Sequence, residues 1–121
     1  MTIADVTYLV PRFEAGAAFL TDVLAYRDLT REPAWPVFAP TRHAGATLRL
    51  AEPKPGEAAA IGRQAGSRVF LFLRVADMAA ECAALARAGH PIEEPLRHEP
   101  YGAIVVIRDP FGNRWDIIEP A

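Results

Sequence analysis

The stretch Asp109-Pro110-Phe111-Gly112-Asn113-Arg114-Trp115-Asp116-Ile117-Ile118-Glu119-Pro120 combines a turn, an apolar strand and a Glu-Pro ending. Its first five residues include Pro, Gly and Asn, which are typical of a turn between two strands. The apolar and aromatic residues that follow predict a strand over residues 113–119. The stretch Leu48-Arg49-Leu50-Ala51-Glu52-Pro53 has a similar pattern and the same ending 67 residues earlier. The chain therefore carries two versions of one strand.

A second match lies near the start of each half of the chain. Val10-Pro11-Arg12-Phe13 corresponds to Val75-Ala76-Asp77-Met78 at an offset of 65 residues. Apolar residues at helical spacing follow both segments. We therefore expect a duplicated βαβββ module, which makes an α+β fold with a curved, cup-shaped mixed sheet and helices on its outer face. The expected strands cover residues 3–10, 46–51, 68–75, 92–98, 101–108 and 113–119, with further short extended pieces within residues 28–52, and the expected helices cover 13–25 and 78–88.

The expected domain organisation follows from this repeat. Residues 1–53 form module one, residues 54–67 a linker rich in Pro and Gly, and residues 68–121 module two, all within one domain. Asp77 is expected to cap the second helix, because its carboxylate accepts from free amides of the first turn. Gly89 is expected to end that helix in the left-handed conformation.

Composition excludes several classes of protein. The chain has 121 residues, of which 51% are hydrophobic and 23% charged, with a formal net charge of −2. This balance is too apolar for a disordered chain and gives no basic footprint for nucleic acid. No apolar run is long enough to span a membrane, the start lacks a signal-peptide pattern, and the single cysteine excludes an internal disulfide. We therefore expect a cytoplasmic protein with no membrane partner.

Strand alternation assigns the side chains that face the cup. Val69, Leu71 and Leu73 form an aliphatic row that suits packing on a helix, so Phe70 and Phe72 face the other way. The repeat offset transfers this assignment to the first strand, where Asp5 and Thr7 face the cup. Four equivalent positions on the concave side are then Asp5, Arg49, Phe70 and Asp116.

The chain strongly resembles the vicinal oxygen chelate superfamily, which includes glyoxalase I, bleomycin-resistance proteins and extradiol dioxygenases. The resemblance covers nearly the whole length and is strongest over Asp109–Pro120, with a second match over Phe19–Tyr26. It implies a homodimer with grooves built from both chains. It also implies that the family's metal enzymes place His, Glu or Gln, His and Glu at the four concave positions.

The four residues present here depart from that ligand pattern. Only Asp116 is a usual ligand type in its place, and Asp5 is the other residue able to bind a cation. Arg49 stays protonated and Phe70 has no donor atom, so we expect no metal and no other cofactor. An alternative reading is that Arg49 replaces the charge of a metal and neutralises Asp5, Asp116 or both.

The remaining candidates are aromatic side chains and histidines. Trp35, Phe38 and Tyr101 lie on segments able to line the cup, where aromatic walls suit planar small molecules. These residues equally suit packing under a long loop or a partner subunit. His43 and His98 are weak candidates for the rim of the cup. Cys82 and Trp115 are expected to pack in the core.

The function predicted from these observations is stoichiometric capture of a planar or aromatic compound. By analogy with bleomycin-resistance proteins, the ligand is an antibiotic held in a dimer-interface cup. The predicted ligand-binding residues are Asp5, Thr7, Arg49, Phe70, Phe72, Asp116, Trp35, Phe38 and Tyr101. One alternative is a lyase, isomerase or dioxygenase with an atypical metal site, or with Asp5 or Asp116 as a general base. Another is a structural or regulatory dimer without a small ligand.

Overall fold

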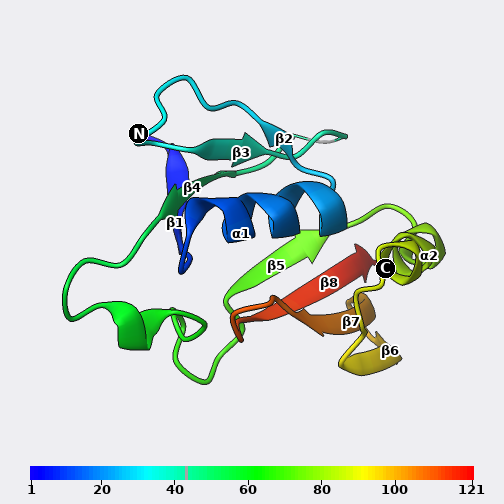
Figure 1. Cartoon of the computed structure of the whole chain (residues 1–121). Helices are drawn as coiled ribbons and strands as arrows, with labels where there is room; N and C mark the ends of the chain where they lie inside the picture. Colours follow the sequence, from blue (N-terminus) through cyan, green and yellow to red (C-terminus); the bar gives the residue numbers. More distant parts are fainter. Residues whose placement is uncertain (43) are drawn as a thin grey trace. The chain divides into compact units, whose positions relative to one another are not determined.

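The computed structural model describes residues 1–42 and 44–121, and His43 lies outside the described residues. The chain divides into two compact units, Met1–Gly62 and Arg63–Ala121, which are described separately below. Figure 1 shows each unit as a small sheet with a helix. The division falls inside the segment 54–67.

The first unit contains a four-stranded mixed sheet in the order β1-β4-β3-β2. β1 is parallel to β4, and the other neighbours are antiparallel. The bounds of its elements are β1 (Asp5–Leu9), α1 (Phe13–Ala18), a π-helical turn η1 (Phe19–Val23), β2 (Arg27–Asp28), β3 (Val37–Ala39), β4 (Thr47–Ala51) and the 3₁₀ turn η2 (Ala58–Ala60).

The second unit repeats this plan, with the sheet order β5-β8-β7-β6. Here β5 is parallel to β8, and β7 pairs antiparallel with β8 and β6. Its elements are β5 (Leu71–Arg74), α2 (Met78–Arg87), β6 (Glu94–Glu99), β7 (Gly102–Arg108) and β8 (Arg114–Pro120). The α+β class and the tandem βαβββ order are thus confirmed.

The strand registers of the two units are equivalent. Asp5 lies opposite Thr47 in the first unit, and the amide of Phe70 donates to the carbonyl of Arg114 at 2.8 Å in the second. Phe70 and Arg114 are the repeat partners of Asp5 and Thr47 at the offsets of 65 and 67 residues seen in the sequence. The duplication therefore extends to the pairing of individual residues.

The repeated Glu-Pro ending has a structural role that the sequence did not reveal. The Glu52 carboxylate accepts from the amide of Phe13, the first residue of α1, at 2.9 Å. The Glu119 carboxylate accepts from the amide of Met78, the first residue of α2, at 2.5 Å. In each unit a carboxylate at the end of β8 or directly after β4 therefore satisfies a free amide and complements the positive end of the helix dipole.

The first helix is shorter than the predicted 13–25. After Ala18 the chain continues as a π-helical turn, and the amide of Leu24 bonds to the carbonyl of Phe19 at 3.3 Å. Gly16 is buried on the sheet, where an added Cβ would lie 2.8 Å from Val10. This close approach explains why a glycine occupies the middle of a helix despite its low propensity.

The second helix matches its predicted ends closely. The Asp77 side chain accepts from the amide of Ala80 at 3.0 Å, and Gly89 has a φ of 69°. Trp115 is fully buried, as expected, whereas Cys82 is only partly buried. No helix in the described part of the chain is long and apolar enough to cross a membrane.

Candidate functional site

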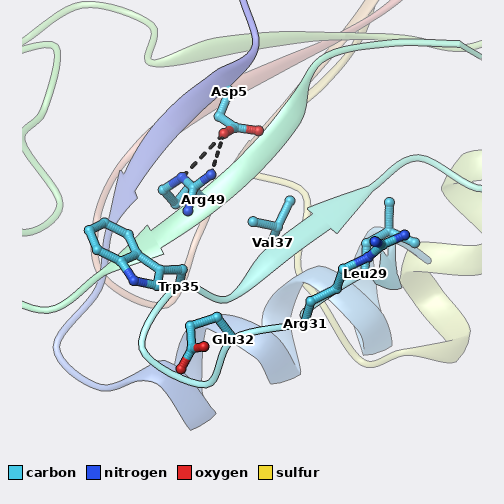
Figure 2. Close-up of a pocket in the computed structure, with 7 residues that line it drawn as sticks. All are labelled: Asp5, Leu29, Arg31, Glu32, Trp35, Val37 and Arg49. Atoms are coloured by element: carbon cyan, nitrogen blue, oxygen red, sulfur yellow. Dashed lines mark hydrogen bonds and ion pairs between the residues drawn. The ribbon is translucent and has the colours of Figure 1, made fainter.

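A shallow hollow of about 350 Å³ lies on the first unit. Figure 2 shows Asp5 and Arg49 on the paired strands β1 and β4, with Trp35 beside Arg49 and with Leu29 and Arg31 farther along the loop between β2 and β3. The hollow is lined by Asp5, Leu29, Arg31, Glu32, Trp35, Val37 and Arg49.

Strand alternation explains which residues reach the hollow. Arg49 pairs with Val37 across β3 and β4, whereas the neighbouring Leu48 pairs with Phe38. Leu48 and Phe38 are each 2% exposed and belong to the core. The expectation that Phe38 lines the wall is therefore wrong, because its position in the register turns it to the core, and Val37 lines the hollow instead.

An ion pair joins two of the predicted site residues. The Asp5 Oδ2 atom lies 2.6 Å from Nη2 and 3.2 Å from Nε of Arg49. The other oxygen of Asp5 accepts from the hydroxyl of Thr47. The hydrogen bond from Thr47 and, to a smaller extent, the one from Arg49 hold the pKa of Asp5 below its usual value of 3.8. Asp5 is therefore an ionised acceptor with both oxygens engaged.

The Trp35 ring lies against the guanidinium of Arg49. The Arg49 Cζ atom lies 5.5 Å from the centre of the Trp35 ring, within the range of a cation–π contact. The Trp35 amide donates to the carbonyl of Glu32 at 2.8 Å, which closes the turn that presents the ring. Trp35 is 58% exposed. An indole held by its turn and by Arg49 thus remains open to a ligand.

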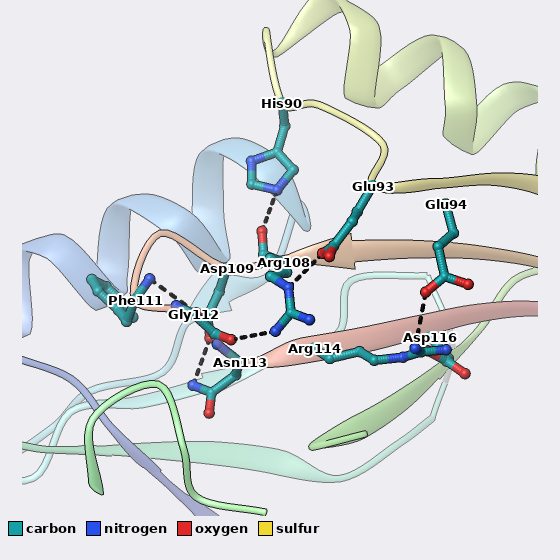
Figure 3. A network of polar contacts seen from close by, with 10 residues as sticks. All are labelled: His90, Glu93, Glu94, Arg108, Asp109, Phe111, Gly112, Asn113, Arg114 and Asp116. Atoms are coloured by element: carbon teal, nitrogen blue, oxygen red, sulfur yellow. Dashed lines mark hydrogen bonds and ion pairs between the residues drawn. The ribbon is translucent and has the colours of Figure 1, made fainter. Parts of the chain in front are cut away.

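Asp116 of the second unit is paired separately. Its Oδ1 atom lies 3.0 Å from Nε of Arg114, whose Nη1 atom lies 2.9 Å from Glu94 (Figure 3). Phe72 pairs with Asp116 in the register and is 67% exposed. Each of the two candidate carboxylates, Asp5 and Asp116, therefore has an arginine partner in its own unit.

The other predicted site residues are more scattered. Phe70 packs edge-on against the buried Trp115, with ring centres 5.4 Å apart. Thr7 is exposed on β1, opposite Arg49. Tyr101 lies in the turn between β6 and β7, where its carbonyl accepts from Ala121 at 3.1 Å. Of the nine predicted residues, the hollow brings together Asp5, Arg49 and Trp35.

Four residues of the hollow were missed by the sequence reasoning. Leu29, Arg31 and Glu32 lie in or beside the irregular segment between β2 and β3, whose path no periodicity predicts. Val37 carried a usable signal, since alternation along a strand places it on the face opposite to its neighbour Phe38. Of the two rim candidates, His98 is exposed on β6, and His43 is the one outside the described residues.

The turn motif of the second unit is built around one buried carboxylate. Asp109 is 4% exposed and accepts from the amides of Phe111, Gly112 and Asn113 at 2.9–3.0 Å. It also accepts from the Asn113 side chain at 2.8 Å and from the indole nitrogen of Trp115 at 3.0 Å. Figure 3 shows Asp109 with Phe111, Gly112 and Asn113, and it also draws Arg114 and Asp116. The turn Asp109–Asn113 therefore has a structural role, because hydrogen bonds to the Asp109 carboxylate hold it together.

Comparison with known families places the chain. The model of the Glyoxalase/Bleomycin resistance protein/Dioxygenase superfamily matches residues 2–117. The chain belongs to this superfamily. Its sequence is 36% identical over 86 residues to an uncharacterized protein of Shewanella frigidimarina, and the match covers 70% of this chain and 64% of that relative.

Solved structures of other proteins share the fold. TnmS3, an antibiotic binding protein from Streptomyces sp. CB03234, aligns with a TM-score of 0.81 and 24% identity over 100% of this chain and 97% of that one. A superfamily member from Sphaerobacter thermophilus aligns with a TM-score of 0.75 and 18% identity over 98% and 97% of the two chains.

The metal site of the superfamily's enzymes does not fit the residues found here. The described residues contain no group of three or more His, Cys, Asp or Glu side chains placed to hold a metal ion. The Arg49 guanidinium lies against the only carboxylate oxygen of Asp5 that Thr47 leaves open. A cation at Asp5 would have to displace an arginine.

Proposed function

We propose that this protein binds a planar or aromatic small molecule without converting it. The exposed indole of Trp35, fixed beside the Asp5–Arg49 pair, is the observation that carries the proposal. Small-molecule sites are usually lined by aromatic and apolar side chains with a few positioned polar groups. The volume of the hollow is near the lower end of the range for such sites.

Stoichiometric capture suits the chemistry of the site better than catalysis. A general base at neutral pH needs a pKa near the working pH. The pKa of Asp5 is lowered, so the carboxylate that lines the hollow favours ligand orientation over proton transfer. The metal-free character of the site is part of the proposal.

The ligand class we propose is an antibiotic or a similar planar natural product. Support comes from the shared fold of TnmS3, which is described as an antibiotic binding protein. We also propose that the working form is a homodimer whose second copy completes the site. The exposed aromatic rings of Phe72 and Tyr101 support contacts with a second copy or with ligand.

Tryptophan fluorescence tests the proposal directly. Trp35 is exposed and Trp115 is fully buried, so a ligand stacked in the hollow should quench mainly Trp35. A panel of bleomycin, a tetracycline and a fluoroquinolone is titrated, with thermal shift as a second readout and mass spectrometry to detect conversion. Trp35→Ala should abolish binding, whereas Leu96→Ala, which removes an exposed apolar side chain of the second unit, should not.

The outcomes separate the candidate functions. Quenching and stabilisation by a compound that is recovered unchanged support capture. Conversion of a bound compound would show an enzyme. Absence of quenching and stabilisation across planar aromatic compounds would overturn the proposal in favour of a structural role. Light scattering across the titration reports whether the protein is a dimer.

A further inference from the structure

One edge of the Arg49 guanidinium is used and another is open. Nε and Nη2 donate to Oδ2 of Asp5 at 3.2 and 2.6 Å. Nη1 has no acceptor among the residues that the structure describes. In Figure 2 this third nitrogen points away from Asp5, and Arg49 lines the hollow together with Trp35 and Val37. The open edge therefore presents donors to the hollow.

The Asp5 carboxylate compensates the charge of Arg49 without offering a site of its own. One of its oxygens accepts from Thr47 and the other from Arg49. An incoming cation finds no open carboxylate oxygen at this end of the hollow. An incoming anion meets a guanidinium whose charge is already paired.

The rest of the lining is also balanced in charge. Glu32 and Arg31 lie at the end of the hollow away from Asp5. Their formal charges cancel, as those of Asp5 and Arg49 do. Leu29 and Val37 add apolar surface beside the Trp35 ring. The hollow thus offers an aromatic face, apolar flanks and polarised N–H donors with no net charge.

We infer that the ligand stacks on Trp35 and presents an uncharged hydrogen-bond acceptor, a conjugated carbonyl oxygen, to Nη1 of Arg49. This inference rests on the proposed function and adds the chemical class of the ligand. Arg49 is then a specificity-determining residue that selects acceptors over cations. A conjugated carbonyl suits Arg49 because the carbonyl oxygen lies in the plane of the ligand's ring. The oxygen therefore reaches the edge of the stacked ligand, where the Arg49 donors lie.

Three tricyclic probes of similar shape test the inference. Acridone carries a neutral conjugated carbonyl, 9-aminoacridine is a cation at neutral pH, and acridine-9-carboxylate is an anion. We expect acridone to quench Trp35 with the lowest dissociation constant, about tenfold or more below that of 9-aminoacridine, as befits a hydrogen bond from a charged donor. Matched salt concentrations keep screening constant.

Variants of the ion pair provide the internal controls. Arg49→Gln should weaken acridone binding by about tenfold. Arg97→Gln removes a similarly exposed arginine that pairs with Glu94 and Glu99, so it should leave binding unchanged. Asp5→Asn leaves Arg49 without its compensating charge and should improve binding of acridine-9-carboxylate by about fivefold relative to acridone.

The results distinguish this inference from the proposed function. Tightest binding of acridone, lost in Arg49→Gln and kept in Arg97→Gln, supports both. Tightest binding of 9-aminoacridine or of acridine-9-carboxylate to the wild-type protein would overturn the inference and leave capture of planar ligands standing. Binding of acridone that Arg49→Gln does not weaken would also overturn it. Failure of all three probes to bind would count against the hollow as a planar-ligand site and so against both.

Discussion

Removing the Asp109 carboxylate should cost this protein a large part of its stability. Asp109→Ala leaves three buried donors without their acceptor: the amide of Asn113, its side-chain nitrogen and the indole nitrogen of Trp115. An unsatisfied buried donor costs about 1–3 kcal/mol, so we expect a loss of at least about 3 kcal/mol. Domains of this kind have a total stability of about 5–15 kcal/mol.

Urea denaturation followed by circular dichroism measures this loss. Asp77→Ala is the matched control, because it removes an exposed carboxylate that accepts one hydrogen bond from the start of α2. The loss of such a helix cap costs about 1 kcal/mol. Thermal unfolding should show a fall in Tm of about 12 °C for Asp109→Ala and about 4 °C for the control.

A second substitution tests the donor pattern itself. In Asp109→Asn, one side-chain oxygen can still accept from the three turn amides, which all bond to Oδ1. The new amide nitrogen would face Trp115 and the Asn113 side chain, which are both donors. We expect a loss of about 2 kcal/mol. If Asp109→Ala lost no more stability than Asp77→Ala, the carboxylate would not be what holds the turn.

Four further substitutions have defined outcomes in denaturation experiments. Gly102→Ala should lower the free energy of unfolding by about 2 kcal/mol or more, because φ is 147° and the new Cβ would overlap the carbonyl of Glu119. Gly89→Ala should lower it by about 1 kcal/mol, because φ is 69° but the space around the new Cβ is open. Burial raises the pKa of Tyr26 above its usual 10.0, so stability should fall as the pH rises past about 10, and Tyr26→Phe should remove that fall. The pKa of Asp5 is lowered in the folded protein, so its ionised carboxylate stabilises the fold above about pH 4. This contribution is lost as the pH falls through the lowered pKa. Asp5→Asn should therefore lose less stability than the wild type on acidification.

Much of the fold could be predicted because the two modules share recognisable sequence patterns. The shared Glu-Pro endings and the matching helix starts identified two modules, and strand alternation placed Trp115 in the core. The α2 helix matched its predicted ends closely, because Asp77 and Gly89 are short-range signals that act through their own backbone.

Predictions failed where long-range contacts decide the conformation. The first helix is helical to Val23, close to its predicted end, but the change from α-helical to π-helical geometry after Ala18 was not predicted. Phe38 faces the core because the register of β3 with β4 places it opposite the buried Leu48. The same segment supplies Leu29, Arg31 and Glu32 to the hollow, and its path has no periodic pattern.

The superfamily and the repeated βαβββ order could be predicted from the sequence, because they depend on local propensity and on alternation along each strand. The tertiary structure alone decided which charges are paired. Asp5 and Arg49 are 44 residues apart in the chain, and only the parallel pairing of β1 with β4 brings the carboxylate within 2.6 Å of the guanidinium. That pairing fixes one edge of Arg49 and leaves the other open beside Trp35.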